Sequence, residues 1–180
     1  DGTFSSPTNY SIGGYVDSVA LGDIDRDGRL DIVATNNDTN SVAILVNQGN
    51  NQFAAPVNYA IGSTLGKVVL GDINQDQRLD IVVANTGSGT AFDYNDAITV
   101  LLNQQNGQFE TRTDYKLATN ISNIALQDLN RDGRLDLIAT YSGQSFASVL
   151  LGNVTGFGTQ PQNFRVNASY GLALADIDGD

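Results

Sequence analysis

Short apolar runs alternate with polar turns along the whole chain. In the first full period the apolar runs lie at 19–22, 30–35, 42–47 and 53–61, and they are rich in Val, Ile and Leu. Asn, Asp and Gly bound these runs, as expected for short strands joined by tight turns. No segment carries a sustained 3.6-residue apolar period, so we expect almost no helix. The pattern predicts four short strands in each period.

Two sequence markers repeat with the same period of about 50 residues. An acidic segment reads DIDRDGRLD at 23–31, DINQDQRLD at 72–80 and DLNRDGRLD at 128–136, and a fourth copy, DIDGD, occupies 176–180. Aromatic residues keep the same phase: Phe4, Phe53, Phe109 and Phe157, followed by Tyr10, Tyr59, Tyr115 and Phe164. Four strands repeated at this interval are typical of a β-propeller blade. We therefore predict an all-β fold of four-stranded antiparallel propeller blades, about three of them, with a flanking strand at each end.

We expect one partial β-propeller over residues 1–180. The predicted repeats span approximately 16–61, 65–117 and 121–166, with 1–12 as the tail of a preceding blade and 171–180 as the start of the next. A propeller closes with about 4–8 blades. The chain is therefore expected to be an excerpt of a longer propeller, or an open array that closes through other copies.

The acidic segment has the spacing of a metal-binding loop. Oxygen-bearing side chains occupy positions 1, 3, 5 and 9, a backbone carbonyl at position 7 adds another donor, and Gly at position 6 permits a sharp turn. Five or six hard oxygen donors suit Ca²⁺ better than Mg²⁺ or Zn²⁺. The predicted calcium site residues are Asp23, Asp25, Asp27, Arg29, Asp31, Asp72, Asn74, Asp76, Arg78, Asp80, Asp128, Asn130, Asp132, Arg134, Asp136, Asp176, Asp178 and Asp180, with the arginines contributing backbone carbonyls.

The alternative is a metal-free hairpin built on Asx-turns. That alternative would crowd like charges together without a counter-ion. Among the three complete loops we expect calcium affinity in the order first, third, second. The first loop has four carboxylates where each of the others has three and an asparagine, and in the second loop Gln77 replaces the glycine of the other two at a position that needs positive φ. Ile24 and Leu30, the apolar residues of the first loop, are expected to point into their own blade.

Composition sharpens this interpretation. The chain carries 20 acidic and 9 basic side chains, for a net charge of −11, and it has no His or Cys. Most of the acids belong to the loops, and Lys and Arg form no cluster. We therefore expect no nucleic-acid partner. The apolar runs are too short for membrane insertion. Without His or Cys, thiol and His-based catalysis is excluded, and no acid outside the loops pairs with a base, so we do not expect an enzyme.

The motif D-[IL]-[DN]-x-D-[GQ]-R-L-D resembles the FG-GAP repeats of the integrin α-subunit propeller and the related VCBS-type repeats. The name-giving signature is reduced to Phe and Pro at Phe4–Pro7 and Phe53–Pro56, which favours the wider repeat family over the integrins themselves. The resemblance implies a seven-bladed propeller with calcium between the first two strands of a blade, on the face opposite the usual ligand face. It also implies an extracellular or cell-surface location.

A partner would bind through loops away from the calcium. The segment 86–96 is longer than its counterpart in the first repeat and contains Phe92 and Tyr94, which are candidate ligand residues. The alternative is that these aromatics simply pack on a neighbouring blade. N-glycosylation sequons occur at Asn9, Asn37, Asn120, Asn153 and Asn167.

Together these patterns predict a calcium-stabilised extracellular binding or adhesion module with a protein or carbohydrate ligand. The alternatives are a non-catalytic propeller flanking a carbohydrate-active enzyme, or a structural repeat that self-assembles into a filament or surface layer.

Overall fold

A computed structural model of the chain describes residues 6–62, 64–85, 96–105, 107–166 and 171–175. The described residues form strands, turns and loops, with no helix among them. The strands are β1 (Val16–Gly22), β2 (Asp31–Asn36), β3 (Ser41–Leu45), β4 (Asn47–Gly49), β5 (Gln52–Phe53), β6 (Val57–Ala60), β7 (Leu65–Gly71), β8 (Asp80–Asn85), β9 (Ala97–Gln105), β10 (Gln108–Lys116), β11 (Ile121–Gln127), β12 (Asp136–Tyr141), β13 (Phe146–Leu150), β14 (Gly152–Asn153), β15 (Gly156–Phe157) and β16 (Gln162–Arg165).

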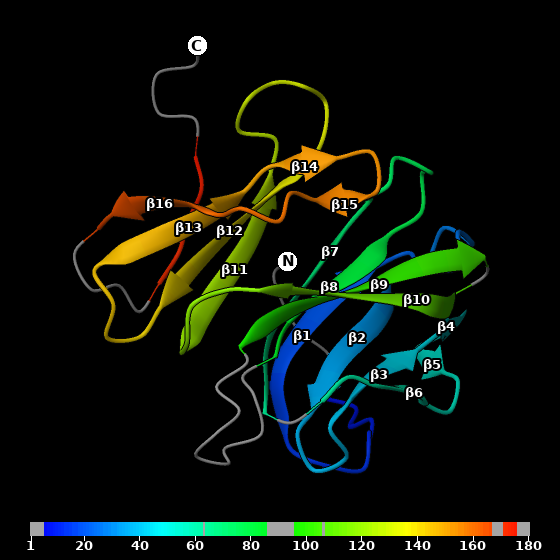
Figure 1. The fold of residues 1–180 in the computed structure, drawn as a ribbon. Helices are drawn as coiled ribbons and strands as arrows, with labels where there is room; N and C mark the ends of the chain where they lie inside the picture. Colours follow the sequence, from blue (N-terminus) through cyan, green and yellow to red (C-terminus); the bar gives the residue numbers. More distant parts are fainter. Residues whose placement is uncertain (1–5, 63, 86–95, 106, 167–170, 176–180) are drawn as a thin grey trace.

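Three antiparallel four-stranded sheets follow one another along the chain (Figure 1). Their strand orders are β1-β2-β3-β6, β7-β8-β9-β10 and β11-β12-β13-β16, so each is a meander of neighbouring strands. We call them blades 1, 2 and 3. Two small hairpins, β4-β5 and β14-β15, extend blades 1 and 3. The prediction of an all-β fold built from four-stranded blades is confirmed.

The innermost strands hold the blades together, because β7 lies against both β1 and β11. A glycine at the end of each of the first two innermost strands allows this close approach. A Cβ atom at Gly22 would lie 2.7 Å from both Leu70 and Leu79 of blade 2. A Cβ atom at Gly71 would likewise lie within 2.9 Å of Leu126 and Leu135 of blade 3. Leucines of one blade therefore fill the space that a missing side chain leaves on the blade before it.

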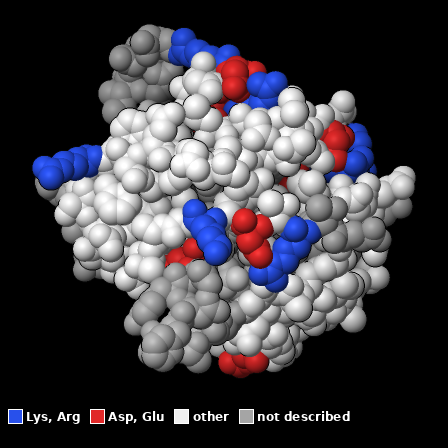
Figure 2. Space-filling model, in the orientation of Figure 1, with Lys and Arg blue, Asp and Glu red and all other residues white. Residues whose placement is uncertain are grey.

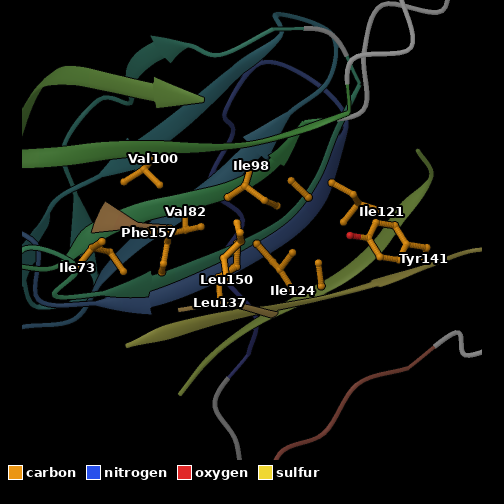
Figure 3. Packing of buried hydrophobic residues seen from close by; sticks show 12 residues of the cluster. Ile73, Val82, Ile98, Val100, Ile121, Ile124, Leu137, Tyr141, Leu150 and Phe157 are labelled. Atoms are coloured by element: carbon orange, nitrogen blue, oxygen red, sulfur yellow. The ribbon is translucent and has the colours of Figure 1, made fainter. Parts of the chain in front are cut away.

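Two apolar clusters fill the spaces between the sheets. One joins blades 1 and 2 through residues such as Ile24, Val42 and Val83. The other joins blades 2 and 3, where Val82, Ile98 and Val100 face Ile124, Leu137 and Leu150 (Figure 3). The core is therefore made between blades as much as within them. Each loop that joins the first two strands of a blade is fixed at the edge of such a cluster.

The recurring aromatics also join neighbouring blades. Tyr10 packs edge-on against Phe53, with ring centroids 4.9 Å apart, and Tyr59–Phe109 and Tyr115–Phe157 repeat the contact at 5.4 and 5.5 Å. The tyrosine hydroxyls also hydrogen-bond to the next hairpin: Tyr59 donates to the Gly107 carbonyl, and Tyr115 accepts from the Phe157 N–H. Phe109 and Phe157 are buried, and Phe53 is half-buried. Phe4 lies outside the described residues.

Three details differ from the sequence-based expectation. The apolar run 53–61 is split between β5 and β6, and Pro56, which has no N–H to donate, lies in the break. The described end segments, 6–12 and 171–175, contain no strand. Leu30 is 57% exposed and is not packed inside its own blade. Its equivalents Leu79 and Leu135 contact the blade before their own, which shows that this position makes contacts between blades.

Candidate metal centre

Each acidic segment forms the loop between the first two strands of its blade. Loop 1 (23–30) joins β1 to β2, loop 2 (72–79) joins β7 to β8, and loop 3 (128–135) joins β11 to β12. The ninth residue of each motif is the first residue of the second strand. These three loops are the candidate metal centres.

The carboxylate at position 1 organises the loop by accepting backbone N–H groups. In loop 1, Asp23 accepts from Asp27 N–H at 3.0 Å and from Gly28 N–H at 2.9 Å. Asp25 Oδ1 accepts from Asp27 N–H, and Asp27 Oδ1 accepts from Arg29 N–H. Loops 2 and 3 repeat all four bonds at distances of 2.7 to 3.2 Å. Side chains at positions 1, 3 and 5 are thereby turned toward the inside of the loop.

The carboxylate at position 9 is buried and ties the loop to its sheet. Asp31 accepts from Ile24 N–H at 2.8 Å and from Asn47 N–H at 2.7 Å, and it is fully buried. Asp80 and Asp136 make the equivalent pairs of bonds. One oxygen of each residue therefore holds the second residue of the loop. The other oxygen holds the backbone just beyond the third strand in blades 1 and 3, and near the end of the third strand in blade 2. The sequence predicts these aspartates as metal ligands and does not reveal this framework role, because the second partner is far away in the chain.

Loop 1 brings three carboxylates close enough to share one cation. One oxygen from each of Asp23, Asp25 and Asp27 lies within 4.8 Å of the others. A donor set made only of oxygen atoms fits a hard cation such as Ca²⁺ and disfavours zinc. In loops 2 and 3 an asparagine, Asn74 or Asn130, stands at position 3. Its amide oxygen accepts the backbone N–H of position 5, as the Asp25 carboxylate does in loop 1. The residues present therefore fit a calcium ion.

The arginine at position 7 contacts the loop through its side chain as well as its backbone. The Arg29 guanidinium forms an ion pair with Asp27, and its Nε donates to the Asn47 carbonyl at 2.8 Å. Arg78 repeats both contacts with Asp76 and Asn103. Sequence analysis assigns only the backbone carbonyls of these arginines to the site. The structure adds a cationic group beside one of the candidate ligands.

Crowding and burial change the acidity of some of these carboxyl groups. Burial, together with the charges of Asp31 and Asp27, raises the pKa of Asp25. Burial raises the pKa of Asp80 to about 6, although the N–H groups of Asn103 and Ile73 act in the opposite direction. In loop 3, the Arg134 backbone N–H lowers the pKa of Asp132. A nearby divalent cation favours the ionised form of a carboxyl group, so it would offset the cost at Asp25 and Asp80.

Tight backbone turns hold the loops in shape. Position 6 has positive φ in each complete loop: 87° at Gly28, 66° at Gln77 and 83° at Gly133. The prediction that Gln77 must adopt this unfavourable conformation is confirmed. Position 4 is also left-handed, with φ of 65° at Arg26, 61° at Gln75 and 60° at Arg131, which the sequence pattern does not indicate because no glycine marks the position.

Acidic side chains form small separate groups on the surface, most of them beside arginine or lysine (Figure 2). This distribution agrees with acids concentrated in loops. Asp176, Asp178 and Asp180 of the fourth copy lie outside the described residues, as do the candidate ligand residues Phe92 and Tyr94.

The opposite end of the blades carries a different repeated contact. Asn37, in the β2–β3 turn, donates to the Leu65 carbonyl and accepts from the Leu65 N–H, and Asp96 accepts from the N–H of Ile121, the equivalent residue of blade 3. Asn37 is also a sequon residue, and these two hydrogen bonds already engage its side-chain amide between blades. The sequon residues Asn9 and Asn120 are exposed.

The FG-GAP-like repeat model matches the chain twice, at residues 23–83 and 72–139. Each match begins at the first aspartate of one loop and includes the next loop, and together they cover more than half of the sequence. The chain belongs to the FG-GAP-like repeat family. A comparison with curated proteins finds no match. FG-GAP-like repeats are generally non-catalytic structural or binding modules, and they suggest a propeller-like arrangement of the blades. In the part of the chain that the structure describes, no helix has the length and apolar character needed to cross a membrane.

Proposed function

We propose that this FG-GAP-like repeat protein is a calcium-stabilised extracellular binding or adhesion module. The observation that carries the proposal is the convergence of Asp23, Asp25 and Asp27, whose carboxylate oxygens lie within 4.8 Å of one another. Asp72, Asn74 and Asp76, and Asp128, Asn130 and Asp132, have the same backbone frame. The extracellular location is proposed from the family, whose repeats are typically found in extracellular proteins.

Calcium would act as a structural ion at these loops. The side chains at positions 1, 3 and 5 would hold it, with the position 7 carbonyl and the position 9 carboxylate as further oxygen donors. The ion would supply the positive charge that the crowded carboxylates lack. An ion that binds the folded chain and not the unfolded chain raises stability in proportion to the logarithm of its concentration above Kd.

Thermal unfolding tests this proposal directly. Calcium at about 100 times its Kd should raise the Tm by about 5–10 °C over metal-free protein. Asp25→Ala should remove part of that increase, whereas Asp17→Ala, an exposed acid outside the loops, should retain all of it. An identical Tm with calcium and in chelator would contradict the proposal, and bound metal measured by mass spectrometry gives an independent count of occupied loops.

The partner that we propose is a protein or a carbohydrate. The candidate contact is the long segment that contains Phe92 and Tyr94, since aromatic side chains flanked by polar groups suit both kinds of ligand. A glycan array probed with and without calcium tests the carbohydrate alternative. Once a ligand is found, the double variant Phe92→Ala with Tyr94→Ala should weaken its binding, and unchanged binding would remove these residues from the site.

Self-association is a second candidate function, and exposed apolar residues at both ends favour it. Leu21 is 61% exposed and Leu30 57%, although their equivalents in blades 2 and 3 pack on a neighbouring blade. At the other end, Leu129 is 46% exposed, whereas its equivalent Ile24 is fully buried. Sedimentation analysis should show concentration-dependent oligomers that Leu21→Glu with Leu30→Glu abolishes. A monomer at every concentration would contradict this candidate. A longer protein in which these repeats flank a carbohydrate-active enzyme remains the other proposal.

A further inference from the structure

Neighbouring loops 1 and 2 are joined by a buried side chain, Asn103. This residue follows the central part of β9 and is fully buried. Its Nδ2 donates to the Ile24 carbonyl of loop 1 at 2.9 Å and to the Leu79 carbonyl of loop 2 at 3.2 Å. Asp25 and Arg26 of loop 1 also line the same open pocket of about 360 Å³ as Arg78 of loop 2. The two loops are therefore direct neighbours as well as being hydrogen-bonded through one residue.

The backbone of Asn103 belongs to the frame of loop 2. Its N–H donates to Asp80 at 2.8 Å, and its carbonyl accepts from Arg78 Nε at 2.8 Å. Any shift of loop 2 that moves Asp80 or Arg78 therefore acts on Asn103. Because both acceptors of its Nδ2 are carbonyls, the side-chain amide has one favourable orientation. Its Oδ1 is buried and finds no donor among the described residues, so the side chain contributes through its two donated bonds.

The contact that Asn103 makes in loop 1 is at a sensitive position. Ile24 lies between Asp23 and Asp25, two of the three converging carboxylates. Its N–H is held by Asp31, and its carbonyl is held by Asn103. Both sides of this residue are thus fixed, one from its own blade and one from the next. Asn103 sets the peptide plane that leads into Asp25.

The equivalent positions in the other blades lack this bridge among the described residues. Asn47 of blade 1 donates to the Leu30 carbonyl of its own loop, and Gly49 N–H satisfies its Oδ1. Gly152 of blade 3 has no side chain. Loops 2 and 3 are joined instead by an exposed bond, from Gln75 Nε2 to the Gly133 carbonyl at 2.7 Å. Water competes with an exposed bond of this kind, so it transmits less than the buried bridge.

We propose that Asn103 couples metal binding at loops 1 and 2, so that calcium in either loop raises the calcium affinity of the other. This inference rests on the proposed calcium function. Ordering loop 2 around an ion fixes Asp80, Arg78 and hence Asn103, which in turn holds the Ile24–Asp25 peptide in the conformation that loop 1 needs. Coupling between two binding sites is reciprocal, so the same increase applies in both directions.

Site-resolved calcium titration by NMR tests the coupling. The amides of Gly28, Gln77 and Gly133 each donate to the first aspartate of their loop, so each reports one site. Asp76→Ala, which disables loop 2, should raise the calcium midpoint of the Gly28 amide by about fivefold. The midpoint of Gly133 should change less. Asn103→Ala should raise the Gly28 midpoint by a similar factor, and adding Asp76→Ala to it should have no further effect.

Asn47→Ala is the matched control, because it removes the same side chain from a position where that side chain's only bond to a loop, among the described residues, is the one to the Leu30 carbonyl of loop 1. In that background Asp76→Ala should still shift the Gly28 midpoint by the full factor. Asn103→Leu, which retains bulk but cannot donate, serves if Asn103→Ala does not fold. General destabilisation by either variant would leave the effect of Asp76→Ala on Gly28 intact, and that result would overturn the role of Asn103.

The outcomes separate this inference from the function on which it rests. If no loop amide of the wild-type protein responds to calcium, the proposed function fails, and the coupling with it. If the amides respond but Asp76→Ala leaves the Gly28 midpoint unchanged, calcium binding stands and the coupling alone is wrong.

Discussion

Loops 1 and 2 have one hydrogen-bonded frame and two different sets of side chains. Loop 1 has four carboxylates and Gly28, whereas loop 2 has Asn74 in place of one carboxylate and Gln77 in place of the glycine. Even so, every bond from a backbone N–H to an aspartate in one loop has its equivalent in the other. The frame therefore depends on the aspartates at positions 1, 5 and 9 and tolerates change at positions 3 and 6.

The comparison separates two roles that a motif of spaced acids combines. The aspartate at position 9 is fully buried and accepts two backbone N–H groups, and in loop 2 both of these hydrogen bonds are buried. Those at positions 1, 3 and 5 are nearer to solvent and converge. Part of the acidic motif is thus needed to build the loop, and part is available to bind an ion. Substitutions that act on only one of these roles test the distinction.

Asp80→Ala should give the largest effect, because it removes the shared frame from loop 2. The N–H groups of Ile73 and Asn103 would lose their buried acceptor, at a cost of about 1–3 kcal/mol each. We expect a loss of about 2–5 kcal/mol in the free energy of unfolding, measured by urea denaturation in metal-free buffer. Asp31→Ala, the same change in loop 1, should cost a similar amount.

The contrast between position 9 and position 1 provides the control. Asp72 also accepts two N–H groups, from Asp76 and Gln77, but Asp76 is only partly buried and Gln77 is exposed, so water can replace the carboxylate. Asp72→Ala should therefore cost clearly less than Asp80→Ala in metal-free buffer. Equal losses would show that the buried aspartate has no special role in the frame.

The second prediction concerns pH. The pKa of Asp80 is about 6 in the folded chain, above its ordinary value of 3.8. The folded state therefore keeps a proton that the unfolded state has already lost between these values. This contribution to stability is complete below about pH 4 and is lost as the pH rises through about 6. It amounts to about 3 kcal/mol, and the raised pKa of Asp25 acts in the same direction.

Urea denaturation of metal-free protein between pH 4 and pH 7 measures this effect. Stability should fall across that range, and calcium should reduce the fall because it favours the ionised carboxylates. Asp80→Asn, which cannot titrate, should show a flatter profile. Stability that rises steadily from pH 4 to pH 6 without metal would be the contrary result.

Much of this arrangement follows from local sequence. The repeat and its apolar runs predict the four-stranded blades. The Asp and Gly residues between the first two runs of each repeat predict the position of the loops. Gly28 and Gly133 mark the position of positive φ and so predict the conformation of Gln77. These features depend on residues close together in the chain, where backbone sterics and strand periodicity act directly.

The rest depends on contacts between distant segments. Asp80 is paired with Asn103 of β9, and Asn103 reaches Ile24 of another blade. Leu30 has the pattern of a residue that points into its own blade, yet its equivalents pack on the preceding one. No spacing rule reveals which blade supplies a neighbour. The split of predicted strand 53–61 into β5 and β6 depends in turn on a small hairpin that blade 2 lacks, since β9 and β10 run on without interruption.

Gln77→Gly should give the smallest effect and sharpens the difference between loops 1 and 2. Gln77 has a φ of 66°, and a residue with a Cβ atom pays roughly 1–2 kcal/mol for this left-handed backbone conformation. Glycine avoids that cost but loses more backbone entropy on folding, which reduces the gain by about 0.5–1 kcal/mol. We expect the variant to gain about 0.5–1 kcal/mol of stability in urea denaturation. Gly28→Gln is the reverse control, since a Cβ atom there meets no atom within 4 Å and only the backbone cost is measured. Because φ is already positive in the folded loop, the gain should appear in stability and leave the calcium affinity of loop 2 below that of loop 1. A variant whose affinity rises to that of loop 1 would instead show that the glycine, and not the fourth carboxylate, distinguishes the two sites.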